Sequence, residues 1–202
     1  MISQTRIRKN LVSLLNESTT EDLEAGRAWY RDARLFAYHV SKRYNFPFVK
    51  VCSVIAALSP RSKWERNKLD AENLINAVLS GSTLPKCSTY GAMVRKAIDI
   101  IKCEGQDTAT MLRILNGPKI SSFFLNIYDG ENRRVTVDTW IHLAAHGKYK
   151  EVKKRKNLGI VEYRKIEAEI KSLSNEMNLK PYETQAILWV SFKRKTEEKD
   201  YN

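Results

Sequence analysis

The chain has 202 residues, of which 43% are hydrophobic, so it is long enough to fold around a core, and wholesale disorder is excluded. Its 35 Lys and Arg residues outnumber its 23 Asp and Glu residues, and the formal net charge of +12 favours a polyanionic partner. We expect that partner to be nucleic acid; an inert basic surface and an anionic membrane are the alternatives. No apolar run approaches the roughly 20 residues that a membrane-spanning helix needs, and residues 1–10 lack the apolar segment of a signal peptide.

The three cysteines, Cys52, Cys87 and Cys103, are odd in number and widely spaced. This pattern matches neither a disulfide framework nor a zinc or iron–sulfur site. Cys52 lies in an apolar run, as a small core residue would. We therefore expect no metal centre built on cysteine, and a reducing cytoplasm as the compartment.

Helical periodicity dominates the first part of the chain, while alternation of β-branched residues is rare. Ser18 followed by Glu21 predicts a capping box that starts a helix ending near Tyr44. The nearly all-apolar run 49–58 fits a buried strand or a buried helix, and we favour a helix because no partner strands are apparent elsewhere. A proline turn ends this run, and a further helix is predicted over 63–79.

Short helices are expected along the rest of the chain, over 93–101, 108–115, 120–127, from 139 to about 145, 159–177 and 182–195. The strongest turn signal, Asn116-Gly117-Pro118, separates the second of these helices from the third. A brief extended piece over 135–137 leads into Asp138. We therefore expect an all-α fold and a single domain over 1–202, with a frayed tail over 196–202.

The turn at Gly117 and Pro118 is a candidate phosphate contact. A glycine-containing turn that opens a helix points backbone N–H groups outward, where they suit a phosphate oxygen. Lys119 would add a point charge. Such a contact positions DNA and does not read base identity. A plain helix–helix turn is the alternative interpretation.

Asp138 lies between the extended piece and an apolar helix. An aspartate in this position is by default a helix N-cap. It can also be a catalytic acid that the helix dipole keeps ionised. Either feature alone would be a weak signal, whereas the turn and the acid together favour a functional site.

Four segments carry a shared pattern in the same order. Residues 55–61 read IAALSPR, residues 90–101 read YGAMVRKAIDII, residues 115–117 read LNG, and residues 137–139 read VDT. They resemble the L-S-x-Q, Y-x-x-K-A-x-x-I, L-P-G-V-G-x-K and V-D-T-H segments of the helix-hairpin-helix DNA glycosylase superfamily, the endonuclease III-like enzymes. The resemblance covers residues 49–147 and implies a two-lobed, helical, glycosylase-like fold with a hairpin over about 108–127 and a catalytic-aspartate segment over 135–146.

Several positions depart from the family pattern. Pro118 and Lys119 stand where the family has Val and its second Gly, and Trp140 replaces the His after Asp-Thr. Ser121 stands where strand-cleaving members carry a Schiff-base lysine; a serine cannot form that imine, so β-lyase activity is not expected unless Lys119 substitutes. The iron–sulfur cysteines are missing. The resemblance thus implies a diverged, monofunctional relative without a cofactor, and leaves open a monovalent cation at the hairpin.

The mechanism implied by the resemblance begins when the target nucleotide is flipped out of double-stranded DNA into a pocket between the lobes. Asp138 would then stabilise positive charge on the deoxyribose or activate a water that attacks C1′. Arg61 matches by position the residue that fills the gap left by the flipped base, with a solvated loop arginine as the alternative. Further DNA contacts are expected from Trp64, Asn67 and the basic run 148–156 with its Lys148, Lys153 and Lys154, unless Trp64 is packed and the run is a solubilising loop.

Three more side chains are candidate pocket residues: Trp140, His142 and Gln185. His142 lies one turn after Asp138 and could orient a substrate, although a surface histidine is the simpler interpretation. Gln185 is the polar exception on an otherwise core-like stripe of the last helix. The histidines His39, His142 and His146 are expected not to cluster with acids or cysteines at metal-ligand spacing, so no metal site is predicted.

The primary functional hypothesis is a monofunctional DNA N-glycosylase that excises a damaged or modified base. A phage enzyme that transfers groups onto modified pyrimidines is the second hypothesis, and a non-catalytic helix-hairpin-helix DNA-binding protein is the third. We expect a monomer with no obligate protein partner and no membrane association, in the cytoplasm of a bacterial or phage-infected cell.

Overall fold

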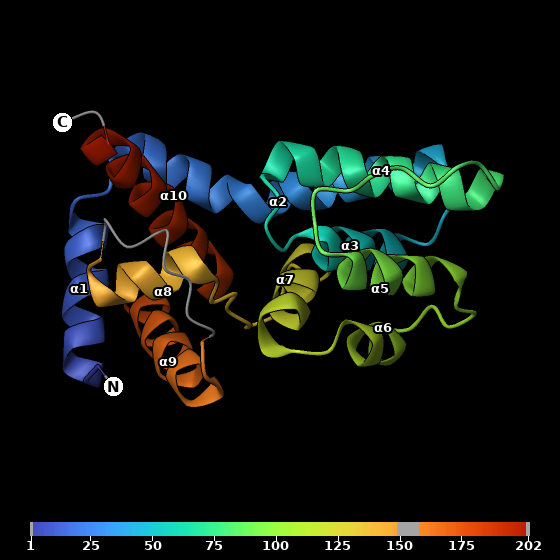
Figure 1. Cartoon of the computed structure of the whole chain (residues 1–202). Helices are drawn as coiled ribbons and strands as arrows, with labels where there is room; N and C mark the ends of the chain where they lie inside the picture. The colour runs from blue at the N-terminus through green and yellow to red at the C-terminus, as the bar shows by residue number, and fades with distance from the viewer. Residues whose placement is uncertain (1, 149–157, 201–202) are drawn as a thin grey trace. The chain divides into compact units, whose positions relative to one another are not determined.

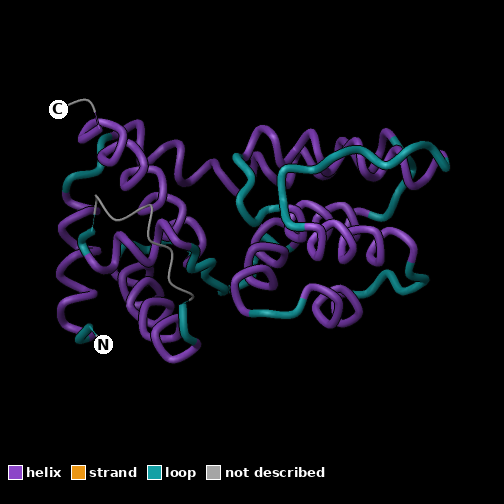
Figure 2. The backbone as a smooth tube through the Cα atoms, in the orientation of Figure 1, coloured by secondary structure: helices purple, strands orange, loops and turns teal. Residues whose placement is uncertain are grey.

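The computed structural model describes residues 2–148 and 158–200, and every regular element in that part of the chain is a helix (Figures 1 and 2). The helices are α1 (Gln4–Asn16), α2 (Thr20–Arg43), α3 (Phe48–Leu58), α4 (Trp64–Ser80), α5 (Gly91–Lys102), α6 (Thr108–Leu115), α7 (Pro118–Tyr128), α8 (Thr139–His146), α9 (Ile160–Glu176) and α10 (Pro181–Asp200). The expected all-α fold class is confirmed for these residues. A glycosylase-like arrangement of two lobes stays a prediction.

The chain divides into two compact units. Unit 1 contains residues 1–31 and 130–202, and unit 2 contains residues 32–129. Helix α2 begins in unit 1 and ends in unit 2. The single domain expected over 1–202 stays a prediction.

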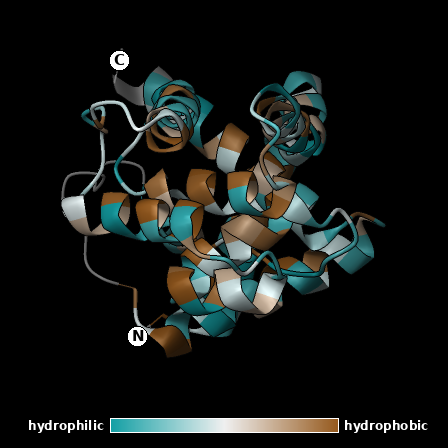
Figure 3. Cartoon of the chain, turned by 90° about the vertical axis from the view of Figure 1, so that its right-hand side faces the viewer, coloured by the Kyte–Doolittle hydropathy of each residue, from teal (hydrophilic) through white to brown (hydrophobic). Residues whose placement is uncertain are grey.

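Unit 2 is organised around α3. This helix is apolar on all sides, and such a helix is stable only when neighbours cover every face. It packs against α4, α5, α6 and α7, and residues from Val49 to Leu58 are all buried. Lys50 is the charged exception, and its Nζ donates to the carbonyls of Ile101 and Cys103 where α5 ends. The surrounding helices are amphipathic, and brown and teal residues alternate along them in Figure 3.

Unit 1 buries its own core between α1, α8, α9 and α10. Helix α1 contributes Ile7, Leu11 and Leu14, which are spaced at i, i+4 and i+7 and so lie on one face. Ser3 caps it by accepting from the N–H of Arg6 at 3.3 Å. No helix was expected over residues 4–16, so α1 corrects that expectation.

The start of α2 corrects a second expectation. The capping box is formed by Thr19 and Asp22, one residue after the expected Ser18 and Glu21. Thr19 N–H donates to Asp22 Oδ2 at 3.0 Å, and Asp22 N–H donates to Thr19 Oγ1 at 3.2 Å. The pairs Ser18–Glu21 and Thr19–Asp22 both fit the sequence pattern of a capping box. A tertiary contact favours the second pair, because Asp22 also accepts hydrogen bonds from Arg194 of α10.

Helices α3 to α9 match their expected ranges within a few residues, including the run 49–58 that was favoured as a helix. Helix α10 was expected to end at residue 195 before a frayed tail, whereas it continues to Asp200. Over residues 2–148 and 158–200, no helix combines the length and the apolar character needed to cross a membrane.

Candidate functional site

The hairpin of unit 2 is the turn between α6 and α7. Helix α6 ends at Leu115, Asn116 and Gly117 follow with φ angles of 46° and 110°, and Pro118 begins α7. A φ of 110° is a conformation that residues with a side chain rarely adopt, so the turn needs glycine at 117, although a Cβ there would meet no atom of the described residues within 4 Å. Proline at the first helical position has a φ angle already suited to the helix.

The hairpin is anchored to α5 at the end of α6, while its turn is exposed. Lys96 of α5 donates from Nζ to the carbonyl of Leu115 at 2.5 Å, which satisfies the end of α6, and Leu115 itself is buried. Gly117 and Pro118 are exposed, and Lys119 is half-buried. Among the described residues, no side chain caps the N-terminus of α7. The positive end of this helix therefore opens on an exposed turn, as an anion contact requires.

Asp138 of unit 1 caps α8. Its Oδ1 accepts from the N–H of Ile141 at 2.9 Å, and its Oδ2 accepts from the indole Nε1 of Trp189 at 3.2 Å. The side chain is half-buried. Two donors and the positive end of the α8 dipole all favour a carboxylate in a defined orientation.

The extended piece before Asp138 is held by tyrosines. Tyr163 of α9 donates its hydroxyl to the carbonyl of Val135 at 2.7 Å and accepts from the N–H of Val137 at 3.3 Å. Tyr30 Oη donates to Gln185 Oε1 at 2.8 Å and lies 3.2 Å from Thr136 Oγ1. Gln185 is 4% exposed, so the structure places this pocket candidate in a buried network behind the aspartate segment.

The other candidates of unit 2 have separate environments. Arg61 is exposed, has a φ of 62° and lies over the Tyr90 ring, with 5.2 Å from Cζ to the ring centroid. Trp64 begins α4 and meets Phe36 edge to face at 6.5 Å. Asn67 is 2% exposed and donates from Nδ2 to the carbonyl of Ile55 at 3.1 Å. Its amide therefore supports the buried α3, and its burial contradicts the expected contact between Asn67 and DNA.

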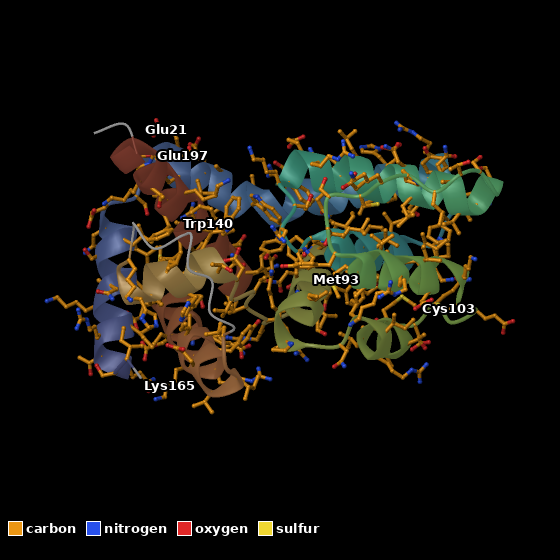
Figure 4. All side chains as sticks on the ribbon, in the orientation of Figure 1. Glu21, Met93, Cys103, Trp140, Lys165 and Glu197 are labelled. Carbon is orange, nitrogen blue, oxygen red and sulfur yellow. The ribbon has the colours of Figure 1, made fainter. Side chains whose placement is uncertain are left out.

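The remaining candidates belong to α8 and the segment after it. Trp140, labelled in Figure 4, meets Phe192 edge to face at 6.2 Å and packs against the core of unit 1. Lys148 is exposed. Lys153 and Lys154 lie outside the described residues. The hairpin lies in unit 2 and Asp138 in unit 1.

A cluster of two histidines and a glutamate in unit 1 contradicts the expectation that the histidines stand apart from acids. His142, His146 and Glu162 each offer one potential ligand atom, and these atoms lie within 4.8 Å of one another. His146 Nε2 is 2.7 Å from Glu162 Oε1, and His142 Nε2 is 3.6 Å from Glu162 Oε2. The spacing of the histidines at i and i+4 was a signal in the sequence. Glu162 could not be found that way, because it comes from the next helix.

The cluster has its own electrostatics. Burial lowers the pKa of His142, and the neighbouring His146 lowers it further. Burial by itself would raise the pKa of Glu162, but the hydrogen bond from His146 and the proximity of both histidines outweigh it, so the pKa lies below its usual value. Both shifts favour a neutral His142 imidazole beside an ionised Glu162 carboxylate.

A model described as a family of unknown function (DUF7178) matches residues 1–196. No curated protein and no solved structure matches the chain.

Proposed function

Since the chain belongs to DUF7178, a family of unknown function, its activity has to be inferred from its own residues, and we propose that it is a monofunctional DNA N-glycosylase. The observation that carries the proposal is the carboxylate of Asp138, oriented at the N-terminus of α8 by Ile141 and Trp189. The proposed partner is double-stranded DNA, and the proposed compartment is the cytoplasm.

Asp138 acts on the sugar of a flipped nucleotide. Cleavage of the bond between base and deoxyribose develops positive charge at C1′, and an oriented carboxylate stabilises that charge or removes a proton from the attacking water. Fixed orientation matters because a group that needs no reorganisation is the more effective one. The buried tyrosines behind residues 135–137 support that orientation from within unit 1.

The hairpin holds the DNA backbone. Exposed backbone at Gly117 and the uncapped start of α7 favour a phosphate oxygen, and Lys119 adds a positive charge. The net charge of +12 acts in the same direction by attracting a polyanion.

Arg61 fills the gap left by the flipped base. Its left-handed φ of 62° is unusual for a residue with a side chain. Such a conformation costs about 1–2 kcal/mol, and strain of this kind often accompanies a functional role. Ser121 in α7 cannot form an imine, so the proposed enzyme releases the base without cleaving the strand.

The test uses duplexes that carry uracil, hydroxymethyluracil, an alkylated base or an oxidised base. Alkali-labile abasic sites are the product, and Asp138→Asn should remove nearly all of it while keeping an N-cap that asparagine also supplies. Asp107→Asn is the matched control, because Asp107 caps α6 in the same way, accepting from the N–H of Thr110 at 2.9 Å. Equal activity in wild type and Asp138→Asn would refute the proposal.

Other products would identify the alternatives. A change of base mass without abasic sites, in the presence of an amine or nucleotide donor, would indicate group transfer onto a modified pyrimidine. Salt-dependent binding with no product on any duplex would indicate a binding module. A covalent adduct trapped by borohydride would show that a lysine such as Lys119 forms an imine, and would overturn the assignment as monofunctional.

A further inference from the structure

We propose that His142, His146 and Glu162 form a binding site for a divalent transition-metal ion of the Zn²⁺ type. The site lies wholly in unit 1, between α8 and α9. It goes beyond the glycosylase activity and does not depend on it.

Helical spacing places the two imidazoles together. His142 and His146 are four residues apart in α8, so they share one face of the helix, and their ring centroids are 4.5 Å apart. Two imidazoles one turn apart are a common way for a helix to supply two ligands to a metal ion.

The third ligand comes from the first turn of α9. Glu162 follows the N-cap Gly159 by three residues, and one carboxylate oxygen faces each histidine, at 2.7 Å from His146 Nε2 and 3.6 Å from His142 Nε2. The three side chains are only 19–22% exposed, so the group is shielded but reachable from solvent. Small side-chain movements would bring three ligand atoms within bonding distance of one ion.

One of the potential ligand atoms, His142 Nε2, lacks a hydrogen-bond partner among the described residues. This nitrogen is buried. Buried polar atoms are usually satisfied by a partner. A metal ion would accept the lone pair of this nitrogen and would take the place of the hydrogen-bonding proton between His146 Nε2 and Glu162 Oε1.

The donor set selects the class of ion. Two imidazole nitrogens and one carboxylate suit Zn²⁺ and similar transition metals, whereas Mg²⁺ and Ca²⁺ prefer sets made of oxygen atoms. Three protein ligands leave a further coordination position for water or an outside ligand. The ion would also join α8, the helix that Asp138 caps, to α9, and so stabilise unit 1.

The test is a titration of the full chain with Co²⁺, followed by competition with Zn²⁺. Visible d–d absorption bands should appear at one equivalent and disappear when Zn²⁺ is added. Zn²⁺ should raise the melting temperature because it binds the folded state, and Mg²⁺ should not. His146→Ala and Glu162→Gln should each weaken binding at least about tenfold, which is the smallest loss seen even for residues that only support a ligand.

His39→Ala is the matched control, because His39 is the one histidine of the chain outside the cluster and is exposed in unit 2. It should leave the titration unchanged. Circular dichroism checks that each variant is folded, and Glu162→Gln preserves the size of the side chain. Binding that survives both ligand substitutions, or an intense near-ultraviolet band from a cysteine thiolate bound to Co²⁺, would overturn the proposal. So would the absence of any metal-dependent change in the wild type.

Discussion

At the scale of single residues, Asp138 has a structural role that has to be separated from the catalytic role proposed for it. Its two oxygens accept from Ile141 and Trp189, so the residue has a structural role whatever else it does. Loss of activity in a variant is therefore informative only if the cap is retained. Asparagine can keep the cap, because its amide oxygen accepts from a backbone N–H, while it removes the negative charge.

We expect Asp138→Ala to lower the free energy of unfolding by about 1 kcal/mol, and Asp138→Asn by only a few tenths. The alanine variant loses the cap of α8 and leaves the Trp189 indole without this acceptor. Urea denaturation followed by circular dichroism measures both values. If the two variants were equally destabilised, the charge of Asp138 and not its capping bond would be the main source of stability.

At the scale of elements, α2 and α10 pack closely at Gly26 in unit 1. A Cβ built at Gly26 would lie 2.5 Å from the Cα of Ile187, which is backbone and cannot turn aside. The glycine therefore permits the close approach of the two helices.

Gly26→Ala should lower the free energy of unfolding by about 1–3 kcal/mol, because α10 must shift to make room. The matched control is Gly91→Ala, where the nearest atom is Arg95 Nη1 at 3.7 Å, an ordinary contact. That substitution should be neutral or slightly stabilising, since alanine is the better helix former. Thermal unfolding of both variants makes the comparison, and an unchanged Gly26→Ala melting temperature would contradict the close packing.

A hydrogen-bonded ion pair between Asp22 of α2 and Arg194 of α10 also joins these two helices. Burial alone would raise the pKa of Asp22, but hydrogen bonds from Arg194 and from the N–H of Thr19 outweigh it and hold the pKa below its usual value. A carboxyl group whose pKa is lowered in the folded state stabilises the protein at pH values above the ordinary aspartate pKa of about 3.9. This stabilisation is lost as the pH falls below that value.

We therefore expect wild type to be more stable than Asp22→Asn at neutral pH, with the difference shrinking as the pH falls below about 4. Urea denaturation at pH 7, 5, 4 and 3 measures the difference. A gap that stays constant over this range would show that charge on Asp22 is not its source.

At the scale of the whole molecule, the net charge of +12 predicts binding to DNA that weakens with salt. The charge acts at long range, whereas the phosphate contact proposed for the hairpin is local, and the two contributions can be separated. Lys119→Ala should reduce the slope of log K against log salt by about 0.9, as expected for one lost phosphate contact. Lys9→Ala, which removes the same charge from an exposed position in α1, should change the slope by less. Fluorescence anisotropy at several salt concentrations measures both, and equal slopes for the two variants would remove Lys119 from the DNA contact.

Local patterns in the sequence determined most of the helices, because spacing, caps and turn residues act over a few positions. Helix α6 lies where it was expected, with Asp107 as its cap, and α3 is the buried helix that its apolar run favoured. Asp138 was correctly expected to be an N-cap. Residues 4–16 were not assigned as a helix, although Ile7, Leu11 and Leu14 had the spacing of one.

Tertiary structure decided what depends on contacts between distant segments. Arg194, far along the chain, donates to Asp22 and so favours this residue in the capping box of α2. The buried amide of Asn67 donates to the carbonyl of Ile55. Glu162 meets His142 and His146 only because α9 packs beside α8. Spacing along one helix predicts which side chains share its face, but a partner on another helix depends on packing. The charge and the helices could therefore be derived from sequence, whereas the candidate metal site emerged only from the fold.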